Sequence, residues 1–237
     1  MQCHTVPVRA LGAVIDFLYP PHCLICTASV APRPERVCGV CWSTIESIDG
    51  SHRAWMESGE KLVRGGLVDG LHALYLFEKN GALQRVLHLL KYGGMHSLGL
   101  RLGRELGRSL AGSGILSEIE AIVPVPLHGA KLRERGYNQS EKICRGIREV
   151  SGAPVVRRAL GRTRNTPSQT TLKMHEREAN VRDAFSVLPV SGRAIQGKTI
   201  LLVDDVLTTG STLRSCACAL KDAGVRSVVC ATVAIAE

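Results

Sequence analysis

The stretch from Ile200 to Leu213 constrains the fold of this chain more than any other segment, because its chemistry changes abruptly in the middle. Four apolar residues, 200 to 203, predict a strand that is buried on both faces of a parallel sheet. They lead directly into Asp204 and Asp205, and two carboxylates cannot stay ionised inside a sheet. We therefore expect this acid pair at the carboxyl end of the strand, where open α/β sheets bind ligands.

A turn of small polar residues follows the acid pair, and it consists of Thr208, Thr209, Gly210, Ser211 and Thr212. Apolar residues at 213, 216, 217 and 220 predict a helix directly after this threonine turn. Hydroxyl and backbone N–H groups at the start of a helix are typical of a phosphate-binding site. A hard divalent cation such as Mg²⁺ would balance the charge of the acids and a phosphorylated ligand. The alternative is a turn whose polar residues only cap the helix.

Four cysteines near the N-terminus form two C-x-x-C pairs, Cys23 with Cys26 and Cys38 with Cys41. Two such pairs are typical of a structural zinc site, because four thiolates fill every position around a tetrahedral Zn²⁺ and leave none for catalysis. The alternative is a set of reduced cysteines without metal. We expect a zinc module over residues 1–60, which begins with a short amphipathic helix from Ala10 to Tyr19.

Alternating strand and helix patterns predict the fold class of residues 61–237. Strand-like patterns cover 67–77 and 121–123, and helical patterns cover 83–90 and 97–110. This order is typical of an α/β domain in which helices flank a parallel sheet. The polar segment 49–66 is expected to be a linker or a short helix between the zinc module and this domain.

A basic segment that follows the strand at 121–123 is a candidate ligand contact. Its polar side chains include Arg133, Arg135, Asn138 and Gln139, which are expected in a loop near the ligand crevice. Arginine suits a two-point grip on pyrophosphate oxygens. The alternative is a solvated basic surface.

A second polar segment carries Arg164, Gln169, Arg177 and Asn180. Because it contains few core residues, we expect a mobile loop that enters a short helix. Such a loop could close over a phosphorylated ligand and exclude water. The alternative is an ordinary exposed loop.

Composition limits the partners and the compartment. A net charge of +9 favours anionic partners without choosing between nucleotides and nucleic acid. Nine cysteines without a secretion signal indicate a reducing compartment, so we expect a cytoplasmic protein. No apolar run approaches the ~20 residues that a membrane span needs. The remaining cysteines of the predicted elements, Cys144, Cys216, Cys218 and Cys230, are expected to fill the core.

Together these motifs resemble the ComF family, whose members pair an N-terminal zinc ribbon with a phosphoribosyltransferase domain. The resemblance covers nearly the whole chain. It is carried by the paired cysteines, Lys91-Tyr92, residues 123–127, residues 135–139, Gln169-Thr170 with Arg177 and Asn180, and residues 203–212.

The resemblance implies the type I phosphoribosyltransferase fold, a parallel sheet flanked by helices, with a hood that we expect over Leu67 to Tyr92. It implies that the acid pair holds the ribose hydroxyls of phosphoribosyl pyrophosphate with Mg²⁺, and that the threonine turn holds the 5′-phosphate. The basic segment would neutralise the departing pyrophosphate. The domain also resembles the catalytic half of glutamine amidophosphoribosyltransferase, but the chain has no glutaminase domain.

ComF proteins are linked to natural transformation, in which single-stranded DNA is drawn into the cytoplasm. The resemblance therefore favours a phosphoribosyltransferase that supports DNA uptake over a purely metabolic enzyme, although no general base is identifiable. The alternative is an inactive accessory protein of a DNA-uptake assembly that binds nucleotides or single-stranded DNA beside its protein partners. An aromatic content of 4% weakens a base-stacking model, so such binding would be mostly to phosphates.

Overall fold

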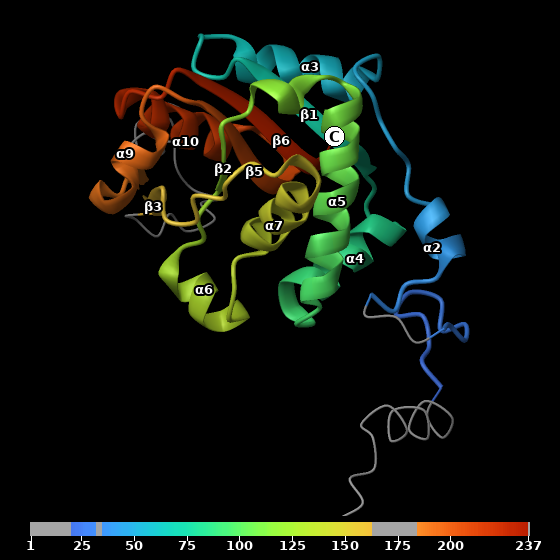
Figure 1. Cartoon of the computed structure of the whole chain (residues 1–237). Helices are drawn as coiled ribbons and strands as arrows, with labels where there is room; N and C mark the ends of the chain where they lie inside the picture. The colour runs from blue at the N-terminus through green and yellow to red at the C-terminus, as the bar shows by residue number, and fades with distance from the viewer. Residues whose placement is uncertain (1–19, 32–34, 163–183, 237) are drawn as a thin grey trace, which may run out of the picture.

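A computed structural model describes residues 20–31, 35–162 and 184–236 (Figure 1). Its strands are β1 (Gly70–Phe77), β2 (Ala121–Pro124), β3 (Leu160–Arg162), β4 (Phe185–Val187), β5 (Thr199–Leu207) and β6 (Ser227–Ala236). Its α-helices are α2 (Gly39–Ser43), α3 (Arg53–Val63), α4 (Ala82–Tyr92), α5 (His96–Gly112), α6 (Gly129–Arg135), α7 (Gln139–Ser151), α9 (Gly192–Ile195) and α10 (Ser211–Asp222). Two 3₁₀ helices cover Ile115–Glu118 and Pro189–Ser191. The helix expected at 10–19 lies outside the described residues.

The central sheet confirms the predicted α/β class. Within the described residues it has four parallel strands in the order β1-β6-β5-β2. A parallel bridge between Ile122 and Val155 extends it beyond β2. The chain leaves β2 toward Val155 but leaves β5 toward β6, so the connections diverge between β2 and β5. Ligands of open α/β sheets bind at such a switch point, beside the carboxyl ends of the strands.

Helices cover both faces of the sheet because successive residues of β5 point to opposite sides. Leu202 packs in one buried cluster with residues of α3 and α10, including Leu62 and Leu213. Leu201 packs in a second cluster with residues of α4, α5 and α7, including Leu102. Figure 1 shows α5 and α7 side by side over one face of the sheet. The result is a sheet between two helical layers.

Glycines allow α5 and α7 to approach closely. A Cβ atom added at Gly103 of α5 would lie 2.1 Å from the backbone oxygen of Ile143 in α7. A Cβ atom added at Gly146 of α7 would lie 2.2 Å from the backbone oxygen of Leu100 in α5. The two backbones therefore touch at a point where a methyl group has no room.

One segment differs from its expected role. Strand β1, which falls in the predicted hood, pairs in parallel with β6 and is part of the central sheet, and residues 46–48 pair with the other side of β1. It belongs to the sheet because its apolar residues are buried in the two core clusters. The segment 49–66, expected to be a linker or a short helix, contains the helix α3, whose Ala54 and Leu62 join the core. Helix α3 crosses the expected boundary at residue 60, and the division into two domains stays a prediction.

The cysteines expected in the core behave in two ways. Cys144, Cys216 and Cys230 are buried, as predicted. Cys218 is half-buried on α10, with its sulfur 3.6 Å from Asp222 Oδ2, so its assignment to the core was wrong. The helical stripe of α10 points Cys216 and Leu220 inward and leaves position 218 on the flank. None of the described helices is long and apolar enough to cross a membrane.

Burial of His72 in β1 should make stability depend on pH. The His72 ring lies 5.1 Å from the Trp55 ring, its Nε2 is 2.9 Å from Ser109 Oγ, and burial lowers its pKa to about 4. The unfolded chain takes up a proton near pH 6.5, so stability is full above this pH and falls as the pH drops toward 4. We expect a loss of about 2 kcal/mol from pH 7 to pH 5 through this residue.

Urea unfolding of the wild type and His72→Gln at pH 7, 6 and 5 measures this contribution. The difference in stability between the two proteins should shrink by about 2 kcal/mol from pH 7 to pH 5. A difference that does not change with pH would show that His72 is not the residue responsible.

Candidate functional site

The acid pair lies within β5, at a place where the neighbouring strand has already ended. Val203 pairs with Pro124, the last residue of β2, whereas Asp204 pairs with Thr232 of β6 on the other side. The strand continues through the acids to Leu207, so the pair lies in the carboxyl-terminal half of β5. The opening on the β2 side exposes Asp204 in part, and Asp205 is 6% exposed.

Short contacts fix both carboxylates. Asp204 Oδ1 accepts hydrogen bonds from Ser140 Oγ at 3.0 Å and from the backbone N–H of Asp205 at 2.9 Å. Asp205 Oδ1 accepts from the backbone N–H of Val206 at 2.8 Å. Asp205 Oδ2 lies 2.7 Å from Lys91 Nζ. Burial, and then the charge of Asp205, raise the pKa of Asp204 to about 7, so this carboxyl group takes up a proton near neutral pH.

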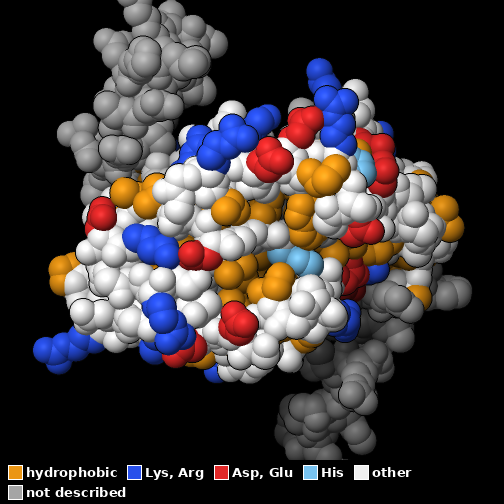
Figure 2. Space-filling view, turned by 90° about the horizontal axis from the view of Figure 1, so that it is seen from above, with side chains coloured by type: hydrophobic (Ala, Val, Ile, Leu, Met, Phe, Trp, Pro, Cys, Tyr) orange, Lys and Arg blue, Asp and Glu red, His pale blue; other side chains and the backbone are white. Residues whose placement is uncertain are grey.

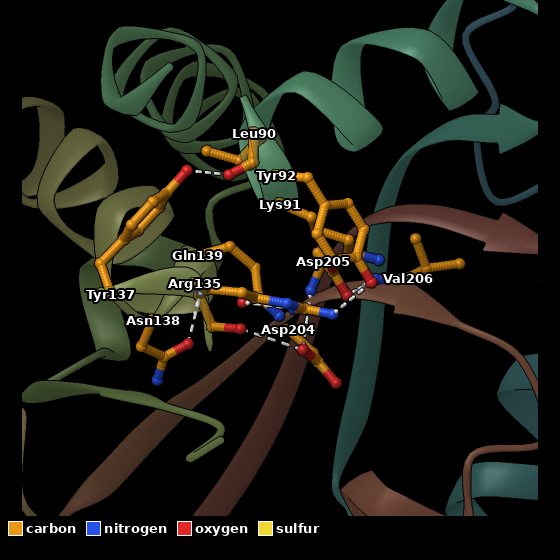
Figure 3. A network of polar contacts seen from close by, with 11 residues as sticks. Leu90, Lys91, Tyr92, Arg135, Tyr137, Asn138, Gln139, Asp204, Asp205 and Val206 are labelled. Carbon is orange, nitrogen blue, oxygen red and sulfur yellow. Dashed lines mark hydrogen bonds and ion pairs between the residues drawn. The ribbon is translucent and has the colours of Figure 1, made fainter. Parts of the chain in front are cut away.

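The last turn of α4 connects the acid pair to the basic segment (Figure 3). Lys91 reaches Asp205, and the hydroxyl of the next residue, Tyr92, accepts from Arg135 Nη2 at 3.1 Å. Arg135 Nη1 donates to Gln139 Oε1, also at 3.1 Å. Residues 91, 135, 139 and 205 come from separate sequence motifs. The structure brings these motifs together in one network of polar contacts.

The basic segment is not the loop that we expected. Residues 129–135 form helix α6, Gly136 ends it with a φ of 74°, and Gln139 begins α7. His128 caps α6 by accepting from the backbone N–H of Ala130, which allows a polar sequence to form a helix. Arg133 is exposed, and its described contacts do not connect it to the acid pair.

Asn138 supports the backbone around the site. Its Nδ2 donates to the carbonyl oxygen of Val125 at 2.9 Å, and its Oδ1 caps α7 by accepting from the N–H of Ser140. Both ends of the amide are therefore engaged. This cap presents Ser140 to Asp204. Sequence reasoning missed Ser140, although its place directly after the Asn-Gln pair was a usable signal.

The threonine turn meets Asp204, the first residue of the acid pair, in one small cavity. Asp204, Val206, Leu207 and residues 208–213 line this space between β5 and α10. Gly210 has a φ of 73° and is the N-terminal cap of α10, a conformation that glycine adopts at no steric cost. Thr209 Oγ1 lies 3.0 Å from Ser211 Oγ. Backbone N–H groups at this helix start are suited to an anion.

A larger cavity of about 630 Å³ opens on the other side of the threonine turn. Helix α3 forms one wall with Arg53, Ser58 and Lys61, and Thr208 to Gly210 form the other. The polar segment between the zinc module and the sheet thus lines the site, which the sequence did not indicate. Residues 164, 169, 177 and 180 lie outside the described residues.

The four predicted zinc ligands come together at the N-terminal end of the described chain. The sulfur atoms of Cys23, Cys26, Cys38 and Cys41 all lie within 4.8 Å of one another. Cys26 Sγ and Cys38 Sγ are 3.7 Å apart, close to the ~3.8 Å that two sulfurs keep around a tetrahedral zinc with Zn–S bonds of about 2.3 Å. This donor set fits zinc.

Backbone N–H groups point at the thiols of this cluster. Cys23 Sγ accepts from the N–H groups of Ile25 at 3.5 Å and Cys38 at 3.4 Å. Burial raises the pKa of the Cys23 thiol, but N–H groups of Cys26, Cys38 and Ile25 outweigh it and lower the pKa to about 6. Such bonds stabilise the thiolate form that a metal requires.

The zinc module is attached to the helical layer by side-chain contacts. Trp42 Nε1 donates to Glu105 Oε2 at 3.1 Å, and the Arg101 guanidinium lies 3.6 Å from the centre of the Trp42 ring. Tyr75 of β1 donates to the same Glu105 oxygen. Arg85 of α4 donates to the carbonyl oxygen of Ile25, between the first two cysteines. The module and the sheet domain are thus in direct contact.

Comparison with known families matches both parts of the chain. Residues 135–236 match the model of the phosphoribosyl transferase domain, and residues 14–53 match the double zinc ribbon domain. The first match contains the acid pair and the threonine turn, and the second contains all four clustered cysteines. The Cys cluster and the ribbon match together support a structural zinc site.

Relatives of the chain include competence and DNA-utilisation proteins. Competence protein F of Haemophilus influenzae is 36% identical over 46% of this chain and 47% of its own length. DNA utilization protein YhgH of Escherichia coli K12 is 33% identical over 62% of this chain and 64% of its own length. Competence protein ComFC of Bacillus subtilis is 29% identical over 44% of this chain and 39% of its own length. The chain thus spans less than two thirds of each relative.

Among solved structures, the glutamine phosphoribosylpyrophosphate amidotransferase of B. subtilis is similar with a TM-score of 0.41 and 24% identity. This similarity covers 58% of the present chain and 26% of the amidotransferase.

Proposed function

The chain belongs to the ComF family, and from this premise we propose that it binds phosphoribosyl pyrophosphate, or a related 5′-phosphoribosyl ligand, together with Mg²⁺. In this proposal the acid pair holds the ribose hydroxyls and the threonine turn holds the 5′-phosphate. The observation that carries the proposal is the small cavity lined by both Asp204 and residues 208–213. One ligand with a diol and a phosphate can therefore contact both groups.

The acid pair fits Mg²⁺ by the chemistry of its donors. Mg²⁺ is bound in proteins by one or two carboxylates together with substrate phosphates. Asp204 supplies such oxygens in the lining of the small cavity, and Asp205 is the next residue of the same strand. When bound, the cation would neutralise part of the pyrophosphate charge.

The network around Arg135 supports a pyrophosphate subsite. Its guanidinium is held by Tyr92 and Gln139, 3.1 Å from each, and a planar arginine suits paired phosphate oxygens. We propose transfer of the phosphoribosyl group rather than binding alone. Neutralising the leaving group and positioning the reactants would then supply the catalysis, because no general base was identifiable from the sequence.

The cavity beside α3 is the proposed place of the group that receives the phosphoribosyl unit. Its 630 Å³ lie within the ~300–1,000 Å³ usual for small-molecule sites, and Thr208 to Gly210 separate it from the small cavity. The named competence relatives favour a role in DNA uptake. A cytoplasmic location is proposed because thiolates that bind zinc need a reducing compartment.

Thermal unfolding with increasing phosphoribosyl pyrophosphate and Mg²⁺ tests the proposal. A ligand at 100 times its dissociation constant adds about 2.7 kcal/mol to stability, so the wild-type melting temperature should rise by several degrees. Asp204→Asn/Asp205→Asn should lose this rise. The control is Asp222→Asn, because Asp222 lies at the end of α10 far from the threonine turn. A wild type that shows no rise would contradict the proposal.

The second candidate is an inactive protein that binds nucleotides or single-stranded DNA in a DNA-uptake assembly. The positive net charge favours it. The face seen in Figure 2 does not, because Lys and Arg side chains alternate there with Asp and Glu around a strip of hydrophobic ones. Binding to phosphates would weaken steeply with salt. An affinity for single-stranded DNA that is unchanged between 50 and 200 mM salt would eliminate this candidate.

A further inference from the structure

The ion pair between Lys91 and Asp205 has no part in the function proposed so far. Lys91 Nζ lies 2.7 Å from Asp205 Oδ2, and the two side chains are 24% and 8% exposed. Asp205 Oδ1 accepts from the N–H of Val206. Before any ligand binds, Asp205 Oδ1 is therefore hydrogen-bonded, and Oδ2 has the ion pair with Lys91 but no hydrogen bond.

The neighbouring acid, Asp204, also has one carboxylate oxygen in hydrogen bonds before any ligand binds. Asp204 Oδ1 accepts from Ser140 Oγ and from the N–H of Asp205. Among the described contacts, Asp204 Oδ2 is left as the carboxylate oxygen of the pair that has no partner. A hard divalent cation prefers several oxygen ligands, so a cation that arrives alone finds one open oxygen and an ammonium group nearby. The positive charges of this cation and of the Lys91 ammonium group would repel each other, because the site is partly buried.

The position of Lys91 offers a way to release Asp205. Lys91 and Tyr92 end α4, and Tyr92 accepts from Arg135 at 3.1 Å. The same turn therefore touches the acid pair and the proposed pyrophosphate subsite (Figure 3). A ligand that brings phosphate oxygens to Arg135 also brings them within reach of a lysine that turns away from Asp205. The cation that accompanies this ligand can then take the vacated oxygen.

We propose that Lys91 is the resident counter-ion of the acid pair, which excludes a free divalent cation and admits one only together with a phosphorylated ligand. The inference rests on the proposed function for the identity of that ligand. If Lys91 has this role, the cation and the ligand bind cooperatively, because the binding of either one makes the free energy of binding of the other more favourable. Lys91 is thus a specificity-determining residue of the site.

Titration of the full chain with Mn²⁺ alone, followed by electron paramagnetic resonance, tests the exclusion. We expect Lys91→Met to bind Mn²⁺ at least about tenfold more tightly than the wild type, since a repulsive charge is removed. Adding Asp205→Asn to Lys91→Met should abolish the gain. Lys91→Arg keeps the charge and should still exclude the cation.

The matched control is Lys221→Met, which breaks another lysine–aspartate pair of 2.9 Å, with Asp69, away from the acid pair. It should leave Mn²⁺ binding as in the wild type. Equal Mn²⁺ affinity in the wild type and Lys91→Met, tight binding in Lys91→Arg, or a gain that survives Asp205→Asn would each overturn the proposal.

Repeating the titration with phosphoribosyl pyrophosphate separates this inference from the proposed function. The wild type should gain Mn²⁺ affinity when the ligand is present, and Lys91→Met should gain much less. If neither protein binds the ligand, the proposed function fails, while the titration with Mn²⁺ alone still decides the role of Lys91.

Discussion

Replacing Gly103 with alanine is expected to destabilise the protein by at least about 3 kcal/mol. The added Cβ atom would lie 2.1 Å from the carbonyl oxygen of Ile143, and backbone at that distance cannot yield without moving α5 away from α7. The higher helix propensity of alanine recovers about 1 kcal/mol at most. Urea unfolding measures the net change.

Gly112 provides a control on the same helix. A Cβ atom added there meets nothing within 4 Å, so Gly112→Ala should leave stability unchanged or slightly higher. Helix α7 also presents Ser140 to Asp204, so Gly103→Ala should weaken ligand binding in whatever protein remains folded. Equal stability of Gly103→Ala and Gly112→Ala would show that the two helices are not held at the distance described here.

Replacing Cys41 with serine is expected to release the zinc ion and unfold the zinc module. The purified wild type should contain about one zinc per chain, and the variant almost none, because a structural site needs all four ligands. Structural zinc contributes on the order of 10 kcal/mol to the folding of small zinc modules. Loss of the module would also break the hydrogen bonds between Trp42 and Glu105 and between Arg85 and Ile25. The outer side of α4 and α5 would then be exposed.

Zinc content by atomic absorption and limited proteolysis together measure this effect. Cys218→Ser is the matched control, since Cys218 lies on α10 outside the cluster. The control should retain its zinc and its resistance to protease. A Cys41→Ser protein with a full complement of zinc would contradict the four-cysteine site.

The sequence predicted the parallel sheet and the place of the acid pair because these depend on local patterns. When an apolar run leads into two acids and then a polar turn before a helix, an α/β domain offers few other places for that segment. The C-x-x-C pairs were similarly informative, since their ligand spacing matches one tetrahedral metal.

Helix α6 and the place of β1 in the sheet were not predicted, for different reasons. Residues 129–135 are mostly polar, and none of them is buried, so the sequence has no apolar stripe that would predict a helix. It forms because His128 and Gly136 cap its two ends. Strand β1 was recognised as a strand, but its place in the sheet depends on pairing with β6, which no local pattern encodes.

The contacts of Lys91 show a further limit of sequence reasoning. The motif Lys91-Tyr92 was noticed without a role, because its partners, Asp205 and Arg135, belong to distant segments. Asn138 was expected to contact a ligand, which stays a prediction, and in the structure its amide caps α7. Asparagine before a helix is a common N-cap, and this local signal was available.

Calorimetric titration with phosphoribosyl pyrophosphate, with and without Mg²⁺, tests whether the acid pair forms a phosphoribosyl site. We expect one binding site per chain, with an affinity that rises when Mg²⁺ is present and is lost in Asp204→Asn/Asp205→Asn but kept in Asp222→Asn. No heat of binding in the wild type at millimolar ligand, or binding that persists unchanged in the double variant, would contradict a phosphoribosyl site at the acid pair.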